Sequence, residues 1–248
     1  MYTCVTVDIE RFQDGISKYG CCHNIEDIKV TRKLLDVLCD RDIPSTLFIL
    51  GRYADEVPMI MDMVKENGHE IASHGYSHMD LRTIPSLLLE KEICQSRIRG
   101  AKGFRAPYYG FDRRMIPYVE NHFMYDSSAV PMRTQGLINQ QIHMLTESLM
   151  EIPISAVGLF PLTSMSLRLL PAALTKRLTL SILKKSGYLI INVHPWEFAT
   201  IPQEVCVPFY VKGRTGQVFL KKFTAFLQFL QELDVEFVTM EHMYEYYR

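Results

Sequence analysis

Long apolar runs are missing from this sequence of 248 residues. Its apolar runs reach about six residues, whereas a membrane-spanning helix needs roughly 18 or more. The first ten residues, MYTCVTVDIE, hold two acidic residues where a secretory signal would need a basic start and an apolar stretch. The sequence therefore predicts no membrane span, and we expect a soluble protein of the cytoplasm.

Positive and negative charges nearly balance in this sequence. The chain has 27 Lys and Arg residues against 28 Asp and Glu residues, a formal net charge of −1. A protein that binds nucleic acid or an anionic membrane through its overall field would be strongly basic. We therefore predict no nucleic-acid partner, and any ligand must be recognised by local groups.

Cysteine motifs and linkers are also lacking. The six cysteines include no CxxC pair, which favours free thiols over a disulfide framework in a chain of this length. No Pro/Gly/Ser-rich linker, internal repeat or low-complexity tract interrupts the sequence. Since 48% of the residues are hydrophobic, an ordinary globular core is expected. We predict that residues 1–248 form a single domain.

What the sequence does contain is an alternation of strand-like and helix-like segments. β-Branched or wholly apolar stretches predict strands, and stretches with helical periodicity predict the helices between them. The expected strands are 3–10, 45–51, 70–73, 102–107, 150–153 and 188–194, and the expected helices include 25–42, 55–67, 86–98 and 166–187. This order is typical of repeated βαβ units, so the predicted class is α/β with a parallel sheet or barrel.

An aromatic stripe lies near the C-terminus. The residues Phe219, Phe223, Phe226, Leu227 and Leu230 recur at the spacing of one helical face. Such a stripe could be a platform for a ligand, but at this spacing we predict a helix that faces the core.

Two carboxylates stand at the end of the first predicted strand. Asp8 and Glu10 are two residues apart, and the period of a strand points both side chains to the same side. Polar residues at the carboxyl ends of parallel strands often form active sites in barrels. Capping and solvation of the two carboxylates is the alternative.

The segment HGYSH follows the predicted strand 70–73 and supplies two histidines. His74 and His78 have the i, i+4 spacing that lets two imidazoles meet one ion if the segment makes a helical turn. Together with a carboxylate of the first strand they could bind a metal ion and leave coordination positions on it open for water, as hydrolytic metal sites require. Alternatively, both histidines are surface residues.

Two more segments carry polar residues at strand ends. In GFRAPYYG, Arg105 can hold a carboxylate by paired hydrogen bonds. In NVHPWEF, His194 precedes Trp196 and Glu197, and its imidazole could donate a proton to a leaving amine near neutral pH. A structural role for a histidine before proline is the alternative.

In order along the chain, these segments resemble the motifs of the polysaccharide deacetylase (NodB homology) family of carbohydrate esterases. TVDIE resembles the first acidic motif, GHEIASHGYSH the metal-binding histidine motif, GFRAPYYG the arginine motif and NVHPWEF the last catalytic motif. YDSS, LMEIPIS, RLLP and HPWEF look most like the branch associated with bacterial exopolysaccharide loci. The resemblance covers nearly the whole chain.

The resemblance implies a distorted (β/α)7 barrel and a metal-dependent hydrolase. The implied reaction removes an N-acetyl group from an amino sugar of a polysaccharide, oligosaccharide or glycan precursor. The implied cofactor is a divalent metal, and zinc is the metal that we expect. An N-acetylated saccharide is thus the expected partner. The family usually has two adjacent aspartates in its first motif, whereas here Ile9 follows Asp8 and Glu10 comes next.

Roles carry over residue by residue. Asp8 resembles the catalytic base, held by Arg105, and His194 resembles the general acid. His74 and His78 resemble two metal ligands. Ile9 cannot coordinate a metal and points away in a strand, so Glu10 is the expected third ligand.

Three residues are expected to meet the substrate. Tyr108 and Trp196 could stack on the sugar, although a core position for Trp196 is equally compatible, and Glu197 is the third. A backbone N–H following Tyr108 could assist the metal in stabilising an oxyanion. Two alternatives stay open at this point: a hydrolase of another amide, such as an allantoinase-like or cyclic-imide hydrolase on the same fold, and a non-catalytic sugar-binding module.

Overall fold

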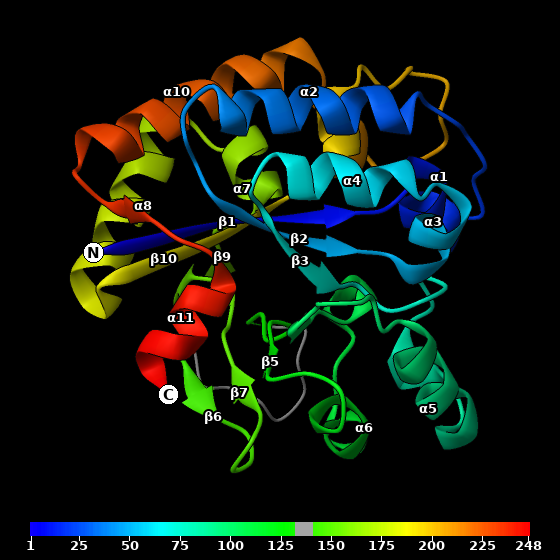
Figure 1. The fold of residues 1–248 in the computed structure, drawn as a ribbon. Coiled ribbons are helices and arrows are strands. Elements are labelled where there is room, and N and C mark those ends of the chain that lie inside the picture. Colours follow the sequence, from blue (N-terminus) through cyan, green and yellow to red (C-terminus); the bar gives the residue numbers. More distant parts are fainter. Residues whose placement is uncertain (132–140) are drawn as a thin grey trace.

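A curled, mainly parallel sheet runs through the molecule (Figure 1). The computed structural model describes residues 1–131 and 141–248. The parallel strands follow the order β10 (Tyr188–Val193), β1 (Tyr2–Ile9), β2 (Ser45–Ile49), β3 (Glu70–Ser73), β4 (Gly103–Phe104), β5 (Tyr125–Asp126) and β7 (Met150–Glu151). β6 (His143–Met144) joins β7 antiparallel, and the short β11 (Glu236–Phe237) pairs with the start of β1.

The two faces of β1 have different surroundings. Val5, Val7 and Ile9 belong to one apolar core together with residues of the covering helices. Thr6 and Asp8 lie on the opposite face, where Arg105 donates hydrogen bonds to both side chains. The period of two along the strand therefore separates the apolar packing from the polar interior of the curled sheet.

Helices cover the outer face of the sheet. In the view of Figure 1, α2 (Asp27–Cys39), α4 (Met59–Glu66) and α10 (Gln217–Glu232) lie above the strands. In the lower half of the same view lie α5 (Ser86–Gln95), α6 (Ile116–Glu120) and α11 (Met240–Tyr247). The remaining helices are α1 (Phe12–Ile16), α3 (Gly51–Glu56), α7 (Ser164–Leu169), α8 (Ala172–Ser186) and α9 (Phe209–Lys212). None of the described helices is long and apolar enough to cross a membrane.

The curled sheet is closed by the segment after β7. The N–H of Ser155 donates to the carbonyl of Ile190 in β10 at 3.0 Å, and the Ser155 hydroxyl accepts from the Ile190 N–H at 2.8 Å. Ordinary strand pairing is short at this place, because β4, β5 and β7 each have two residues. The predicted α/β class and distorted barrel are confirmed, with the distortion at β4, β5 and β7.

Two predicted helices are each split in two by a proline. The expected helix 55–67 is interrupted at Pro58, between α3 and α4, and the expected helix 166–187 is interrupted at Pro171, between α7 and α8. Proline lacks the N–H of a helical hydrogen bond and disfavours a helical residue before it. The strand predicted at 150–153 is confined to β7. The hairpin of β8 (Ala156–Val157) and β9 (Phe160–Pro161), and the C-terminal α11, were not expected from the sequence.

The aromatic stripe of α10 packs in the core, as predicted. Phe219, Phe223, Leu227 and Leu230 have no exposed side-chain surface, and they share one cluster with residues of β1 and α2. The stripe of α10 therefore stabilises the core and presents no ligand platform.

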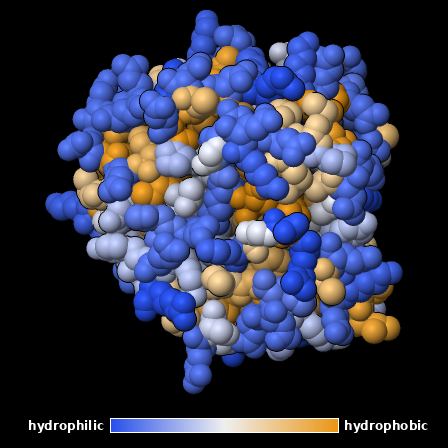
Figure 2. All heavy atoms as spheres, viewed as in Figure 1, coloured by the Kyte–Doolittle hydropathy of each residue, from blue (hydrophilic) through white to orange (hydrophobic). Residues whose placement is uncertain are grey.

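On the face of the molecule drawn in Figure 2, hydrophilic side chains predominate and hydrophobic ones show in patches between them.

We expect Phe223→Ala to lower the free energy of unfolding by about 3–5 kcal/mol, because it leaves a cavity in the core between α10 and the sheet. Val218→Ala is the matched control, since Val218 lies on the same helix and is 58% exposed. Its effect should stay within about 0.5 kcal/mol. Urea unfolding followed by circular dichroism measures both, and equal midpoints for the two variants would contradict the core assignment.

Candidate active site

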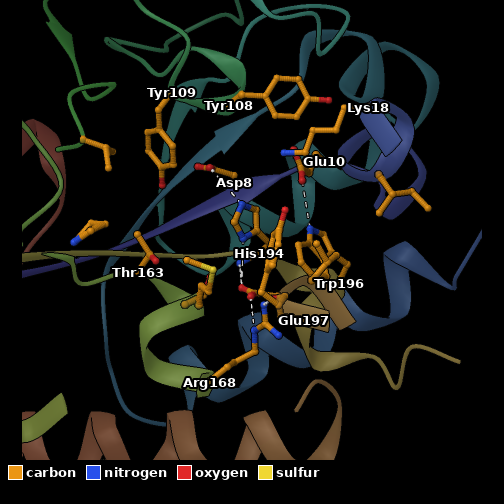
Figure 3. A pocket seen from close by; sticks show the side chains of 18 of the residues that line it. Asp8, Glu10, Lys18, Tyr108, Tyr109, Thr163, Arg168, His194, Trp196 and Glu197 are labelled. Carbon is orange, nitrogen blue, oxygen red and sulfur yellow. Dashed lines mark hydrogen bonds and ion pairs between the residues drawn. The ribbon is translucent and has the colours of Figure 1, made fainter. Parts of the chain in front are cut away.

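A pocket of about 520 Å³ opens at the carboxyl ends of β1, β3 and β10. Eight of the nine predicted site residues line it, all except Arg105: Asp8, Glu10, His74, His78, Tyr108, His194, Trp196 and Glu197. They come from segments far apart in the chain, and the parallel strands bring them to one edge of the sheet. Figure 3 shows Asp8 and Glu10 on the same side of His194, with a dashed line from the Glu10 carboxylate to Trp196. The volume is in the range of pockets that hold small-molecule ligands.

Asp8 and Glu10 face the pocket together, as the strand period predicts. Ile9 between them is fully buried in the core on the other side of β1. The Asp8 side chain is 4% exposed and that of Glu10 is 5% exposed. Both carboxylates therefore depend on protein groups for their stabilisation.

Glu10, His74 and His78 form a buried cluster. One ligand atom from each lies within 4.8 Å of the others. The His74 Nε2 atom is 3.7 Å from the Glu10 Oε2 atom, and the His78 Nε2 atom contacts the same oxygen. Two imidazoles and one carboxylate that converge in this way are a donor set suited to a divalent transition metal.

The other ring nitrogen of each histidine is held by a neighbour. The Nδ1 atom of His74 is 3.0 Å from the backbone carbonyl oxygen of Arg105, and the Nδ1 atom of His78 is 3.1 Å from the Tyr108 hydroxyl. The carbonyl can only accept a hydrogen bond, so Nδ1 of His74 carries a proton and Nε2 is the atom that faces the cluster. Such outer contacts fix the tautomer of metal-binding histidines.

Glu10 is oriented in the same manner. The indole N–H of Trp196 donates to Oε1 at 3.2 Å, so Oε2 is the oxygen that faces the imidazoles. Gly15 packs against the same carboxylate, and a Cβ atom at that position would come within 2.6 Å of Oε1. Burial raises the pKa of Glu10, but the histidines outweigh it and hold that pKa well below its usual value. Trp196 and Gly15 thus fix the orientation of the Glu10 carboxylate.

The histidine segment is not helical. His74 and His78 approach each other through a bend in which Gly75 has φ 72° and His78 has φ 63°. The i, i+4 spacing does bring the imidazoles together, with their ring centroids 5.5 Å apart, but not by the helical turn considered from the sequence. A positive φ at a histidine is uncommon, and such residues cluster at functional sites.

Asp8 is held from two sides. The Nη1 atom of Arg105 donates to Oδ1 at 2.8 Å, and the side-chain amide of Asn192 donates to Oδ2 at 2.9 Å. Burial raises the pKa of Asp8, but the charge of Arg105 and the nearby imidazoles outweigh it and lower that pKa. The expected paired hydrogen bonds from Arg105 to this carboxylate are replaced by one bond from Arg105 and one from Asn192.

The remaining donors of Arg105 are used elsewhere. Its guanidinium has no exposed surface and also donates to the Ser127 carbonyl, the Ser127 hydroxyl and Thr6. Sequence reasoning missed both Asn192 and Ser127. A signal existed for Asn192, because it is the one polar residue in the apolar strand YLIINV and lies two residues before His194, on the same face.

His194 takes part in a chain of charged groups. Its Nε2 atom is 3.6 Å from Asp8 Oδ2, and its Nδ1 atom is 3.2 Å from Glu197 Oε2. The other oxygen of Glu197 accepts from Arg168 Nε at 2.7 Å (Figure 3). Burial alone would lower the pKa of His194, but Glu197 and the nearby carboxylates raise it to about 9. The imidazole is therefore protonated at neutral pH.

Arg168 is a further residue that the sequence did not reveal. Its side chain is 2% exposed, and its Nη2 atom donates to the Tyr210 carbonyl at 2.9 Å. Another nitrogen, Nη1, donates to the carbonyl of Gly213 at 2.5 Å. It begins the RLLP segment of the resemblance, but a basic residue within a helical stretch usually has an exposed position, so no buried role was predicted for it.

The three predicted substrate residues occupy different positions. Tyr108 lines the pocket and is partly exposed. Trp196 is 8% exposed and packs against Phe12, with its ring centroid 5.5 Å away. Glu197 is 1% exposed, and both of its oxygens already accept hydrogen bonds from protein groups.

The backbone around Tyr108 differs from the expectation for an oxyanion site. The N–H that follows Tyr108, that of Tyr109, donates to the carbonyl of Ala106 at 3.0 Å, so it is already used within the turn. Tyr108 and Tyr109 both have positive φ, 57° and 56°. Two consecutive left-handed residues that are not glycine indicate backbone strain beside the pocket.

One family model matches part of the chain. Residues 24–124 match the family model described as polysaccharide deacetylase. That segment includes both clustered histidines and Arg105, but neither Asp8 nor His194.

Two curated relatives match parts of the chain. A chitooligosaccharide deacetylase from Sinorhizobium fredii is 33% identical over 86 residues, which are 32% of this chain and 40% of that protein. A peptidoglycan-N-acetylglucosamine deacetylase from Bacillus cereus is 32% identical over 106 residues, 40% of this chain and 38% of that protein. The chain thus matches about two fifths of the length of each relative.

Solved structures share the fold over nearly the whole chain. An allantoinase superposes with a TM-score of 0.67 at 12% identity, covering 98% of this chain and 89% of that one. At this identity the likeness concerns the fold alone, and the branch associated with exopolysaccharide loci stays a prediction. Over residues 24–124 the chain is therefore similar to the polysaccharide deacetylase family, and parts of it are similar to the two deacetylase relatives.

Proposed function

We propose that this protein is a metal-dependent hydrolase that removes N-acetyl groups from an amino sugar of a polysaccharide, oligosaccharide or glycan precursor. The observation that carries the proposal is the buried cluster of Glu10, His74 and His78 beside the Asp8 carboxylate, in one pocket. The names of the two curated relatives support the same reaction class.

The cluster fits a divalent metal, for which we propose zinc. Glu10 Oε2 and the two Nε2 atoms would hold the ion, because their other polar atoms are already engaged by neighbours. When bound, such an ion polarises an amide carbonyl and makes water a stronger nucleophile at neutral pH. These buried donors leave room for water and substrate on the pocket side.

Asp8 is the proposed base. Its lowered pKa keeps it ionised near neutral pH, so it can accept a proton from the water that attacks the acetyl carbonyl carbon. Arg105 and Asn192 fix the carboxylate by one hydrogen bond to each oxygen. Since Asp8 is held in place before the substrate binds, little reorganisation is needed during the reaction.

His194 is the proposed acid. Glu197 occupies the Nδ1 side of the ring, so the Nε2–H is the proton directed toward the pocket and Asp8. When the C–N bond breaks, this proton passes to the departing amine, and the acetyl group leaves as acetate. We propose that Glu197 positions His194 and supports its charge rather than contacting the sugar.

Tyr108 and Trp196 take different parts in this proposal. Tyr108 is partly exposed in the pocket, where its ring can stack on a sugar. Trp196 donates its indole N–H to Glu10 and lies largely in the core, so we propose that it orients the metal ligand.

Acetate release tests the proposed function. We expect the protein to release acetate from N-acetylglucosamine oligosaccharides, to lose this activity after chelation and to regain it when zinc is added back. Cyclic amides and imides should be poor substrates. Hydrolysis of a cyclic amide without acetate release would favour the allantoinase-like reaction, whereas saccharide binding without any hydrolysis would favour a binding module.

We expect His194→Ala to lower kcat by about 10²–10⁴-fold, the usual contribution of a positioned acid. Metal content should not change, because His194 is outside the cluster. Steady-state kinetics together with elemental analysis checks both statements. His242→Ala is the control for histidine removal, since His242 is exposed and outside the pocket. Wild-type turnover by His194→Ala would refute the role.

Glu197→Gln should move the alkaline limb of the pH–rate profile to lower pH. Glu197 raises the pKa of His194, so its neutralisation lets the imidazole lose its proton at lower pH, and only the protonated form can act as acid. The measurement is kcat against pH for both proteins. Glu204→Gln, an exposed change in the same region of the chain, should leave the limb in place. An active Glu197→Gln protein with an unmoved limb would contradict the coupling.

A further inference from the structure

One side of the pocket mouth is apolar. Leu159, Phe160 and Pro161 of the β8–β9 hairpin and Met165 of α7 line the same pocket as Asp8 and His194. We call these four residues the apolar rim. Thr163 joins the hairpin to α7, and Figure 3 shows it across His194 from Trp196. The connection between the hairpin and α7 is therefore on the side of the proposed acid that lies away from Trp196.

The rim is exposed although it is apolar. Phe160 is 74% exposed, Leu159 is 60% exposed and Met165 is 38% exposed. Single exposed apolar side chains are ordinary, but grouped ones at the mouth of a pocket mark a binding surface.

The hairpin that carries the rim is anchored to the body of the protein. The N–H of Leu162 donates to the Ser155 carbonyl at 2.8 Å, and the hydroxyl of Ser166 donates to the Pro161 carbonyl at 2.6 Å. Ser155 is itself bonded to β10. The rim is thus held at a fixed place beside the pocket before any ligand binds, which lowers the entropy cost of binding.

The chemistry of the rim suits an apolar chain better than a further sugar ring. Sugar rings bind through hydrogen bonds to their hydroxyls and by stacking on aromatic faces. Of the four rim residues only Phe160 offers an aromatic face, and none offers a side-chain hydrogen-bonding group apart from the weakly accepting Met165 sulfur. An alkyl or isoprenoid chain would gain from every methylene that it buries there.

We propose that the apolar rim binds a long apolar chain attached to the amino sugar, so that the substrate is an amphiphilic glycoside of the lipid-linked kind. The inference rests on the proposed function, because the sugar occupies the pocket and the chain leaves it over the rim. The continuity of the rim with the pocket argues for the substrate's own chain as the occupant.

Chain length is the variable that tests this proposal. We expect kcat/KM for acetate release from N-acetylglucosamine β-glycosides, used below their micellar concentrations, to rise at least tenfold from the methyl to the octyl glycoside. Phe160→Ser and Leu159→Ser should bring the octyl-to-methyl ratio toward one. Leu87→Ser should keep the wild-type ratio, because Leu87 is 81% exposed on α5, outside the pocket.

Binding without turnover separates this proposal from the proposed function. Trp196 is the single tryptophan of the sequence and lines the pocket, so its fluorescence reports occupancy. Octyl β-glucosaminide, which has no acetyl group, should bind at least tenfold more tightly than methyl β-glucosaminide. Phe160→Ser should remove this difference in affinity. If no acetate is released from any substrate but this difference is found, the proposed reaction fails while the rim stands.

Two results would overturn the role of the rim. The first is acetate release and binding that are both independent of chain length. The second is a loss in Phe160→Ser that is equally large for a chitooligosaccharide and for the octyl glycoside, since the rim would then be a subsite for sugar.

Discussion

The contact of the Glu10 carboxylate with the imidazoles of His74 and His78 is the interaction on which the site depends. Burying an anion is costly unless charges or hydrogen bonds compensate it. Here the strand end of β1, the bend after β3 and the indole of Trp196 all converge on one carboxylate. The parallel sheet makes this convergence possible, because it brings segments distant in the sequence to one edge.

One buried arginine holds the proposed base, and another holds the carboxylate that positions the proposed acid. Arg105 fixes Asp8 from inside the curled sheet, and Arg168 fixes Glu197 beside His194. Each guanidinium also bonds to backbone carbonyls, so its position is determined by the fold. A guanidinium stays charged at all relevant pH values, so each can stabilise its carboxylate throughout the reaction. The base is thereby kept deprotonated and the acid protonated at the same pH.

Much of this arrangement could be predicted from the sequence. The period of a strand predicted that Asp8 and Glu10 share one face. Because His74, His78 and His194 follow predicted parallel strands, they were expected at the same end of the sheet. Asn192 and Arg168 were not predicted, because their importance arises from partners far away in the chain. The rim was missed for a similar reason, since the β8–β9 hairpin is short and is held by tertiary hydrogen bonds rather than by strand propensity.

Metal content tests the central claim most directly. After incubation with zinc and removal of the excess, elemental analysis should find one equivalent in the wild-type protein and in the exposed control His242→Ala, and none in His74→Ala. Circular dichroism establishes that each variant is folded. Zinc retained by a folded His74→Ala protein, or no zinc in the wild type, would contradict the account of Glu10, His74 and His78 as a metal site.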